Sequence, residues 1–167
     1  MTMMQLPCSP GTALAQAIEP ALALLPEAMR SQEAKVLLLA IMLQESGLRT
    51  RQQIGGPAHG IAQCERPILQ LLLDNKASTI EVHALCQSRA VAPLASDMYW
   101  ALLMDDVFAA GIARLILWCD PHTLPPMGDA DDAWLCYQKN WGPGKPRPAD
   151  WPGNYQAAMT AISGVAA

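Results

Sequence analysis

Residues 36–63 read VLLLAIMLQESGLRTRQQIGGPAHGIAQ, an apolar run that ends in glutamine, glutamate, serine and glycine. The first eight residues, Val36 to Leu43, carry no polar side chain, which predicts a helix that is buried on all sides. Gly47 is a natural helix stop and places Glu45 in the last turn. The helix dipole and the apolar surroundings both disfavour a charged carboxylate there, so we expect a raised pKa at Glu45, as a general acid needs. A solvated glutamate is the alternative for a single Glu on a helix.

Length and composition predict one compact domain over residues 1–167. Of the 167 residues, 51% are hydrophobic and 16% are charged, as in a folded globular chain. No apolar run is long enough for a membrane span, and the first residues, MTMMQLPCSP, lack the basic and apolar regions of a signal peptide. A net charge of −4 without a basic run argues against nucleic acid or anionic lipid as a partner. We therefore expect a protein made in the cytoplasm, without a membrane span.

The five cysteines form an odd set without a CxxC pair. This pattern favours reduced thiols that pack as small hydrophobic side chains, with disulfides as the alternative. Two short pairs, His83 with Cys86 and Cys119 with His122, would in principle supply four zinc ligands. Their separation by 32 residues fits no known zinc framework, so we expect no metal and no other cofactor.

The pattern of apolar residues, prolines and glycines predicts a nearly all-helical chain. Ser31 is a good N-cap for the long apolar helix, whereas residues 48–64 should form a loop or an irregular ribbon. The segments 120–129 and 140–154, rich in Pro and Gly, should also be loops. The expected helices cover residues 12–29 (interrupted at Pro20 and Pro26), 31–46, 67–73, 78–90, 97–118, 131–139 and 155–162. The fold class is therefore mainly α, with about six to eight helices and a short irregular or β-like region after Glu45.

Three short motifs follow one another along the chain. Residues 45–47 read ESG, residues 60–63 read GIAQ and residues 140–144 read NWGPG. The glycine of the second motif lies fifteen residues after Glu45, and its glutamine lies eighteen residues after it. The chain resembles the soluble lytic transglycosylases and goose-type lysozymes, in which a helix ends in Glu-Ser-Gly and a Gly-Leu-Met-Gln motif follows at the same distance. Residues 110–115, AGIARL, are similar to the glycine-bearing helix that precedes the third motif of that family.

The resemblance spans about residues 31–160 and is closest to short phage and prophage proteins of this type. It implies a lysozyme-like domain that cleaves peptidoglycan at the β-1,4 bond between N-acetylmuramic acid and N-acetylglucosamine. Glu45 would act first as the general acid and then as the base that takes the 6-hydroxyl proton, which gives a 1,6-anhydromuramoyl end. No acidic residue lies between Glu45 and Glu65. A lytic transglycosylase needs no second carboxylate, and a hydrolytic lysozyme is the alternative.

The resemblance also implies a set of substrate-binding residues. These are Ser46, His59, Gly60, Gln63, Tyr137, Asn140 and Trp141. The chain departs from the family at Lys139, where the family has a tyrosine directly before the asparagine. The nearest tyrosine, Tyr137, lies about one helical turn before Asn140. His59 stands where the family often has arginine, and Ala62 where it has methionine.

Each of these residues also has a purely structural interpretation. Ser46 could simply end a helix, and the glycines could form turns. Tyr137 could be a half-buried core residue rather than a partner of Glu45. Trp141 and Trp151 lie in expected loops, where their rings could either stack on sugars or anchor the loop by packing.

The expected partner is the glycan strand of peptidoglycan, bound by a monomer. Two routes would bring such a protein to the wall. A phage endolysin waits in the cytoplasm until a holin opens the membrane, whereas a virion-associated enzyme is carried in the phage particle. The rival from another class is a non-catalytic glycan-binding or virion structural module of the same fold. Glu45 argues against that rival, because a degenerate copy usually loses its acid.

Overall fold

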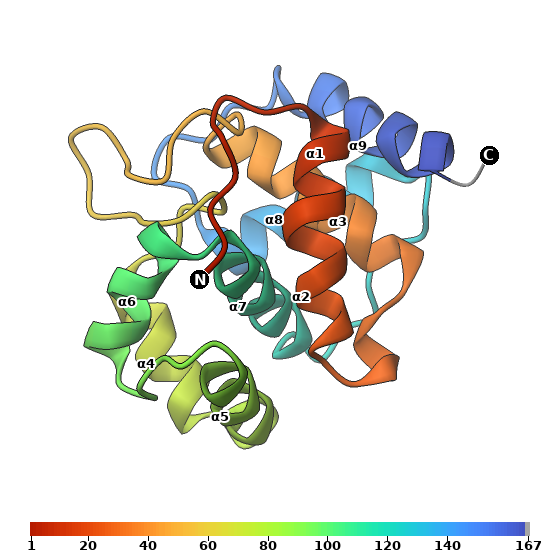
Figure 1. Cartoon of the computed structure of the whole chain (residues 1–167). Coiled ribbons are helices and arrows are strands. Elements are labelled where there is room, and N and C mark those ends of the chain that lie inside the picture. The colour runs from red at the N-terminus through yellow and green to blue at the C-terminus, as the bar shows by residue number, and fades with distance from the viewer. Residues whose placement is uncertain (166–167) are drawn as a thin grey trace.

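The long apolar helix lies at the centre of the molecule. In the computed structural model, which describes residues 1–165, this helix is α3 (Gln32–Glu45). It begins after Ser31, whose side-chain oxygen accepts a hydrogen bond from the backbone N–H of Ala34 at 3.2 Å. Every residue from Val36 to Met42 is at most 2% exposed. The prediction of a helix without a polar face is confirmed, since other helices cover α3 on all sides (Figure 1).

Segments from both ends of the chain pack against α3. The N-terminal elements are α1 (Pro10–Ala13), the π-helical η1 (Leu14–Ile18), α2 (Glu19–Ala23) and the 3-10 turn η2 (Glu27–Met29). They cover the predicted helix 12–29, although α1 begins two residues earlier. The π-helical turn η1 comes directly before Pro20, which has no N–H to donate. The helical segment that ends with α2 stops before Pro26, as predicted.

A second group of helices lies beside this core. It consists of α4 (Arg66–Asp74), α5 (Thr79–Ser88) and α6 (Ala95–Met104), which lie together at the lower left of Figure 1. The next helix, α7 (Asp106–Trp118), contacts all three and also packs on α2 and α3. Because all residues of α7 up to Leu117 are buried, this helix joins the two groups into one unit.

The prediction of one helix over residues 97–118 is wrong, because the chain breaks at Asp105. This residue is extended (φ −149°, ψ 102°), and its carboxylate accepts hydrogen bonds from the backbone N–H groups of Val107 and Phe108 at 3.1 and 3.2 Å. Arg89 donates two further hydrogen bonds to the same carboxylate, at 2.7 and 2.9 Å. Asp105 is therefore an N-cap fixed by a cation, and the apolar pattern on both sides of it concealed the break.

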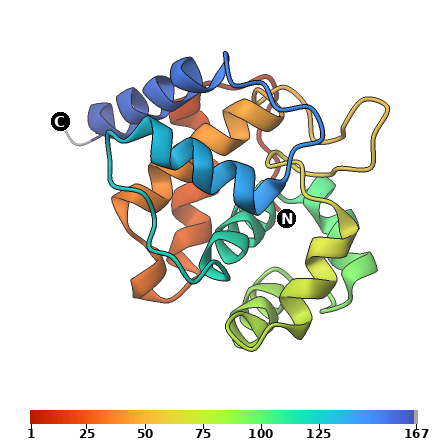
Figure 2. The ribbon, with the colours of Figure 1, turned by 180° about the vertical axis from the view of Figure 1, so that it is seen from behind.

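The C-terminal helices are both longer than predicted. They are α8 (Ala130–Trp141), which lies in the foreground of Figure 2, and α9 (Trp151–Val165), which packs on α3. α8 ends at Gly142 in the left-handed conformation (φ +52°). α9 begins at Trp151, with a proline in its first turn, where a missing N–H costs nothing.

Residues 48–64 form the irregular ribbon that the sequence predicts. Its only regular pairing consists of isolated bridges from His59 to Gln52 and to Cys64. The ribbon rests on α6, where the hydroxyl of Tyr99 donates a hydrogen bond to the carbonyl oxygen of Pro57. It projects from the molecule between α3 and α6 (Figure 1).

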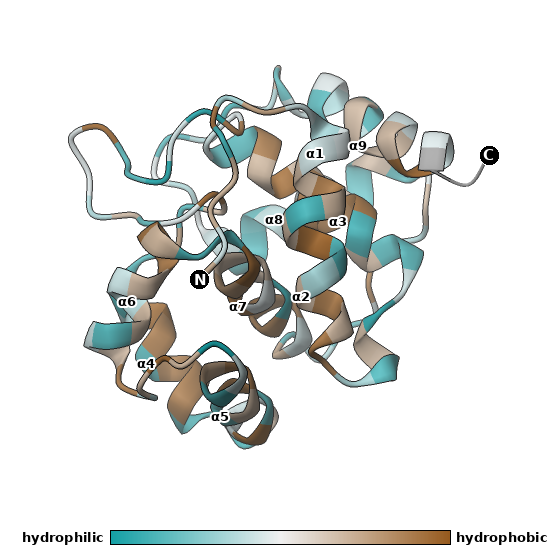
Figure 3. Cartoon of the chain, viewed as in Figure 1, coloured by the Kyte–Doolittle hydropathy of each residue, from teal (hydrophilic) through white to brown (hydrophobic). Residues whose placement is uncertain are grey.

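One hydrophobic core holds these elements together. Its residues come from the N-terminal helices, α3, α4, α5, α6, α7, α8 and α9, and Figure 3 shows hydrophobic stretches on α4, α5 and α7. The predicted fold class, a mainly helical single domain with little β-structure, is confirmed. Among residues 1–165, no helix combines the length and hydropathy that crossing a membrane requires. All five cysteines are free thiols, and Cys64 and Cys86 are buried.

Candidate functional site

An open groove of about 970 Å³ lies at the C-terminal end of α3. Its walls come from the ribbon, the start of α4, the end of α8 and the turn after α8. The residues with chemical groups on its walls are Gln44, Glu45, Gln53, Gln63, Cys64, Glu65, Tyr137, Asn140, Trp141, Lys145 and Arg147. Most of the predicted site residues therefore meet at one place, although they come from three distant parts of the chain.

Glu45 is the last residue of α3 and is half-buried in the groove wall. Its Oε1 accepts a hydrogen bond from the hydroxyl of Tyr137 at 2.6 Å. Burial raises the pKa of Glu45 above its ordinary value, and the hydrogen bond from Tyr137 and the charge of Arg147 oppose this only in part. The carboxyl group therefore has the reach and the proton affinity of a general acid.

Tyr137 is a buried tyrosine of α8, only 2% exposed, and its ring stacks on that of Trp151 with centroids 5.2 Å apart. Burial, together with the hydrogen bond to Glu45 and the charge of Glu45, raises the pKa of Tyr137 well above its ordinary value. The phenol therefore stays protonated and is a donor to the carboxylate. It reaches Glu45 from one turn before Asn140, the spacing noted in the sequence.

Of the two interpretations left open for Trp151, the structure supports packing rather than sugar stacking. Its side chain is only 3% exposed, and its indole N–H donates a hydrogen bond to the carbonyl oxygen of Ala130 at 2.8 Å. Trp151 lies behind Tyr137 and holds that ring in place. The first turn of α9 thus acts as a support for the groove wall.

A clamp of three residues, which the sequence analysis missed, fixes the turn after α8 to the end of α3. The side chain of Gln44 donates a hydrogen bond to the carbonyl oxygen of Arg147 at 2.9 Å and accepts one from Asn154 at 2.8 Å. Arg147 in turn donates to the carbonyl oxygen of Gln44. This exchange satisfies a carbonyl group at the helix terminus and places a cation near Glu45. Gln44 was the available signal, because it is a polar residue, 1% exposed, at the end of an apolar run.

Ser46 does not line the groove. Its hydroxyl donates to the carbonyl oxygens of Ile61 at 2.7 Å and Met42 at 3.1 Å, and it accepts a hydrogen bond from the N–H of Leu48 at 3.2 Å. With these bonds Ser46 ends α3 and fixes the GIAQ segment beside it. The structural interpretation of Ser46 therefore holds: the residue supports the groove from behind and does not form part of its wall.

The two outer residues of the GIAQ segment play different parts. Gln63 lines the groove in a left-handed conformation (φ +51°), and its side-chain N–H donates to the carbonyl oxygen of Gly60 at 2.6 Å. Gly60 (φ +78°) lies away from the groove, where a side chain would come within 3.2 Å of Leu102 and Ala109. Only glycine fits there, because α6 and α7 approach the backbone closely.

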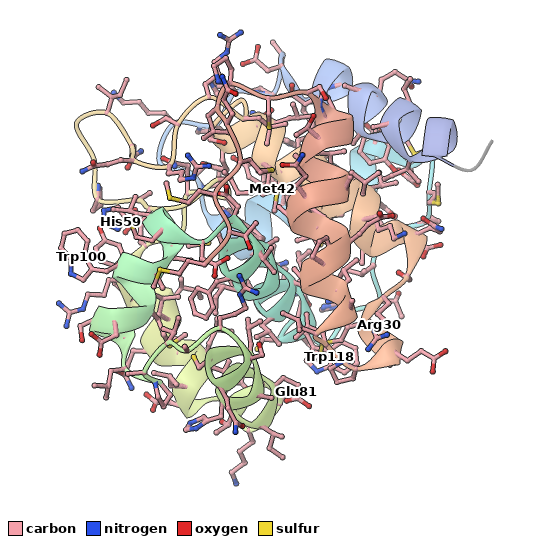
Figure 4. All side chains as sticks on the ribbon, viewed as in Figure 1. Arg30, Met42, His59, Glu81, Trp100 and Trp118 are labelled. Atoms are coloured by element: carbon pink, nitrogen blue, oxygen red, sulfur yellow. The ribbon has the colours of Figure 1, made fainter. Side chains whose placement is uncertain are left out.

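His59 points away from the groove, so its predicted contact with substrate finds no support. It is 4% exposed, its ring stacks on that of Tyr99 at 3.7 Å, and its Nδ1 lies 3.1 Å from the carbonyl oxygen of Tyr99. Figure 4 shows His59 beside Trp100 at the edge of α6. This stacking attaches the ribbon to the second group of helices.

Asn140 and Trp141 end α8 and both line the groove. The indole N–H of Trp141 donates to the carbonyl oxygen of Ala62 at 2.8 Å, which leaves the face of its half-buried ring at the groove. The side chain of Asn140 donates to Asp120 at 2.9 Å and to the carbonyl oxygen of Cys136 at 2.9 Å. Asn140 therefore belongs to a polar network at one end of the groove and makes no direct contact with Glu45.

The acidic residues divide into two kinds. Asp105 and Asp106 are fully buried and held by ion pairs with Arg89 and Arg51, so they are structural. Glu65, which precedes α4, is exposed and lines the same groove as Glu45. The structure therefore brings a second carboxylate to the groove, which the sequence analysis did not expect.

Comparison with known proteins adds nothing to this geometry. No protein-family model matches the chain, and searches of curated proteins and of solved structures also found no match. Within the described residues, no group of three or more His, Cys, Asp and Glu side chains is arranged to hold a metal ion. The function must therefore be argued from the groove itself.

Proposed function

We propose that this protein is a peptidoglycan-cleaving enzyme that acts on the β-1,4 bond between N-acetylmuramic acid and N-acetylglucosamine. One observation carries the proposal. The carboxyl group of Glu45 lies half-buried in the wall of a groove of about 970 Å³, with a raised pKa and a hydrogen bond from Tyr137 that orients it. Cleavage of a glycosidic bond requires this kind of proton donor at the leaving oxygen. The resemblance of the ESG, GIAQ and NWGPG motifs to lytic transglycosylases and goose-type lysozymes points to the same substrate.

In this proposal the neutral carboxyl group of Glu45 donates its proton to the glycosidic oxygen as the bond breaks. Tyr137, whose phenol stays protonated, then stabilises the carboxylate that forms. The 2-acetamido oxygen of the substrate assists at the anomeric carbon. Glu45 finally takes the proton of the 6-hydroxyl group as that oxygen closes on the anomeric carbon. The product is a 1,6-anhydromuramoyl end, no water is consumed, and Glu45 is protonated again.

Contacts to the sugars would come from groups that face the groove. Gln63 has both a donor and an acceptor for amide and hydroxyl groups, and Trp141 presents an aromatic face. Asn140 would bind the strand at the end of the groove nearest Asp120. As a phage product, the enzyme would reach the wall through a holin or within the particle.

A hydrolytic reaction is the second candidate, and Glu65 favours it. This exposed carboxylate lines the groove together with Glu45 and could act as a base toward a water molecule. The resulting enzyme would be a muramidase, with the same bond and the same acid but a reducing muramic end.

The test is mass spectrometry of the muropeptides released from purified sacculi by the wild-type protein. A transglycosylase gives products that lack one water and have no reducing muramic end, whereas a muramidase gives reducing ends that disappear in Glu65→Gln. Glu45→Gln should release neither kind of product. Glu27→Gln, which changes an exposed residue that does not line the groove, should behave as wild type. Binding of sacculi without release of any product would overturn the proposal in favour of a non-catalytic module.

A further inference from the structure

Arg114 is a buried cation that the groove does not explain. It lies on α7, is 3% exposed, and takes no part in any ion pair within the described residues. Its Nε donates a hydrogen bond to the carbonyl oxygen of Met29 at 2.9 Å. Its Nη1 is the single buried side-chain nitrogen or oxygen among those residues that has no hydrogen-bond partner.

This arrangement costs free energy. A buried guanidinium normally pairs with a carboxylate, because removing a charge from water is expensive unless its hydrogen bonds are replaced. The only compensation besides Met29 is the ring of Trp118, whose centroid lies 5.4 Å from the guanidinium carbon. Burial accordingly lowers the pKa of Arg114 to about 10. A buried donor without a partner in a native protein calls for an acceptor.

Arg114 lines a second pocket of about 460 Å³, which shares no lining residue with the groove at Glu45. The opposite wall is the start of α3, represented by its N-cap Ser31 and by Glu33 in its first turn. Figure 4 places Trp118, at the end of α7, beside Arg30, which directly precedes this N-cap. Although the N–H of Ala34 is already bonded to the side chain of Ser31, the N–H groups that precede it in this 14-residue helix have no partner inside the helix and form its positive end.

We propose that this pocket binds an oxyanion group, a phosphate or a carboxylate, between the guanidinium of Arg114 and the first turn of α3. The two walls supply complementary donors, since planar guanidinium nitrogens and helix N-terminal N–H groups both bind such oxygens. His122 and Thr123 at the rim of the pocket would add further donors.

Two carboxylates also line the pocket, and they differ in how they would affect an anion. Asp120 is already paired with Lys139 at 2.7 Å, and Nδ1 of His122 lies 2.8 Å from the same carboxylate. Although burial raises the pKa of Asp120, hydrogen bonds from Lys139, His122 and Asn140 hold it well below its ordinary range. Glu33 has no ion pair within the described residues, and because it lines the same pocket as Arg114, its charge would repel a bound anion. A bound anion must overcome the repulsion from the Glu33 carboxylate, so removal of that charge should tighten binding.

The experiment is an NMR titration of the full chain labelled with ¹⁵N at arginine side chains. Sodium phosphate and sodium acetate are added separately at constant ionic strength, with chloride as the reference salt, and the Nε–H resonance of Arg114 is followed. A saturable shift with phosphate, with acetate, or with both supports the site and identifies the shape of the oxyanion that it accepts. A linear drift equal to that in chloride overturns the proposal.

Variants separate specific binding from a general salt effect. A bound anion should also protect the folded protein against thermal unfolding, and this protection should saturate. Arg114→Met should raise the anion concentration that gives half of the protection by about tenfold. Arg66→Met, which changes an exposed arginine of α4, should leave that concentration unchanged. Since Arg114→Met leaves the acceptor Met29 unpaired and could fail to fold, Glu33→Gln is the second variant. It should bind the anion several-fold more tightly than wild type. If Glu33→Gln instead destabilises the protein and no anion affects the wild type, Glu33 is the partner of Arg114 and the site does not exist.

Discussion

The C-terminal end of α3 and the N-terminal end of α7 both carry carboxylates, and the two ends use them in opposite ways. Asp105 and Asp106 are fully buried at a helix start, where the dipole favours negative charge and each has an arginine within 2.9 Å. Glu45 is half-buried at a helix end, where the dipole opposes its charge and its only direct partner is the neutral Tyr137. The comparison shows that burial alone does not distinguish the proposed catalytic acid from the structural aspartates. The decisive difference is whether the surroundings stabilise the charge.

The largest expected effect comes from removing the acid at each end. Glu45→Gln should reduce muropeptide release by about 10²- to 10⁴-fold, because it deletes the proton donor. Asp106→Asn should instead cost about 3–5 kcal/mol of unfolding free energy, because it breaks a pair in which Asp106 is fully buried and leaves the part-buried Arg51 without its full partner. Urea unfolding and a sacculus-release assay on both variants measure the contrast. Equal loss of stability in both would mean that Glu45 is structural too.

A smaller effect is expected from the hydrogen bond to Glu45. Tyr137→Phe removes a donor that stabilises the carboxylate, so the pKa of Glu45 should rise further and the alkaline limb of the kcat/KM profile should move to higher pH. Loss of orientation should lower kcat by about tenfold. A pH–rate profile checks both effects. The matched control is Tyr155→Phe, also a buried tyrosine, whose hydroxyl accepts from Gly128 outside the groove.

Removing the cation near Glu45 should give a weaker shift in the same direction. Arg147 lowers the pKa of Glu45, but its effect is smaller than that of the hydrogen bond from Tyr137, so Arg147→Gln should raise the pKa of Glu45 by less than Tyr137→Phe does. The pH–rate profile at low salt is the measurement, since the influence of an exposed cation is screened at high salt. An alkaline limb that moves to lower pH would contradict the assigned electrostatics.

The smallest effect is on stability as a function of pH. The pKa of Glu45 is higher in the folded than in the unfolded protein, so its contribution to stability is present below the unfolded pKa and is lost as pH rises through the folded pKa. Glu45→Gln should therefore unfold at an equal or slightly higher temperature than wild type at pH 7, with the difference shrinking as pH falls toward 4. Calorimetry at both values tests this. A variant that is less stable at pH 7 would show that the charged form of Glu45 is favoured by the fold.

Local sequence signals predicted the parts of this molecule that depend on neighbouring residues. The apolar run identified α3, and Gly47 placed Glu45 in its last turn. The same reasoning failed at Asp105, because the apolar pattern of α6 continues into α7 and hides an N-cap that a distant residue, Arg89, completes. The same reasoning predicted a loop up to residue 154, although α9 already begins at Trp151, whose side chain is buried.

The candidate site could be predicted from the sequence only at residues whose type and position point to a single role, such as Glu45 at the end of an apolar helix. Glu45 and Tyr137 meet, which was one of the two interpretations left open for Tyr137. The role of His59 depends on Tyr99, which lies 40 residues further along the chain. The clamp between Gln44 and Arg147 joins residues 103 positions apart, and no periodic pattern reveals such a contact. Ser46 illustrates the remaining difficulty, because its hydroxyl could serve a sugar or a backbone and only the fold decides between them.

The clamp of Gln44, Arg147 and Asn154 bears on how a polymer would approach Glu45. A strand inside a cross-linked wall offers no free terminus, so it must be laid sideways into an enzyme rather than threaded through it. The segment 142–150 is mostly exposed and is fastened to α3 at Gln44, so it forms a fixed wall beside the open groove. Under the proposed function, an open groove with a fixed wall would accept the interior of a strand without any need for a free end.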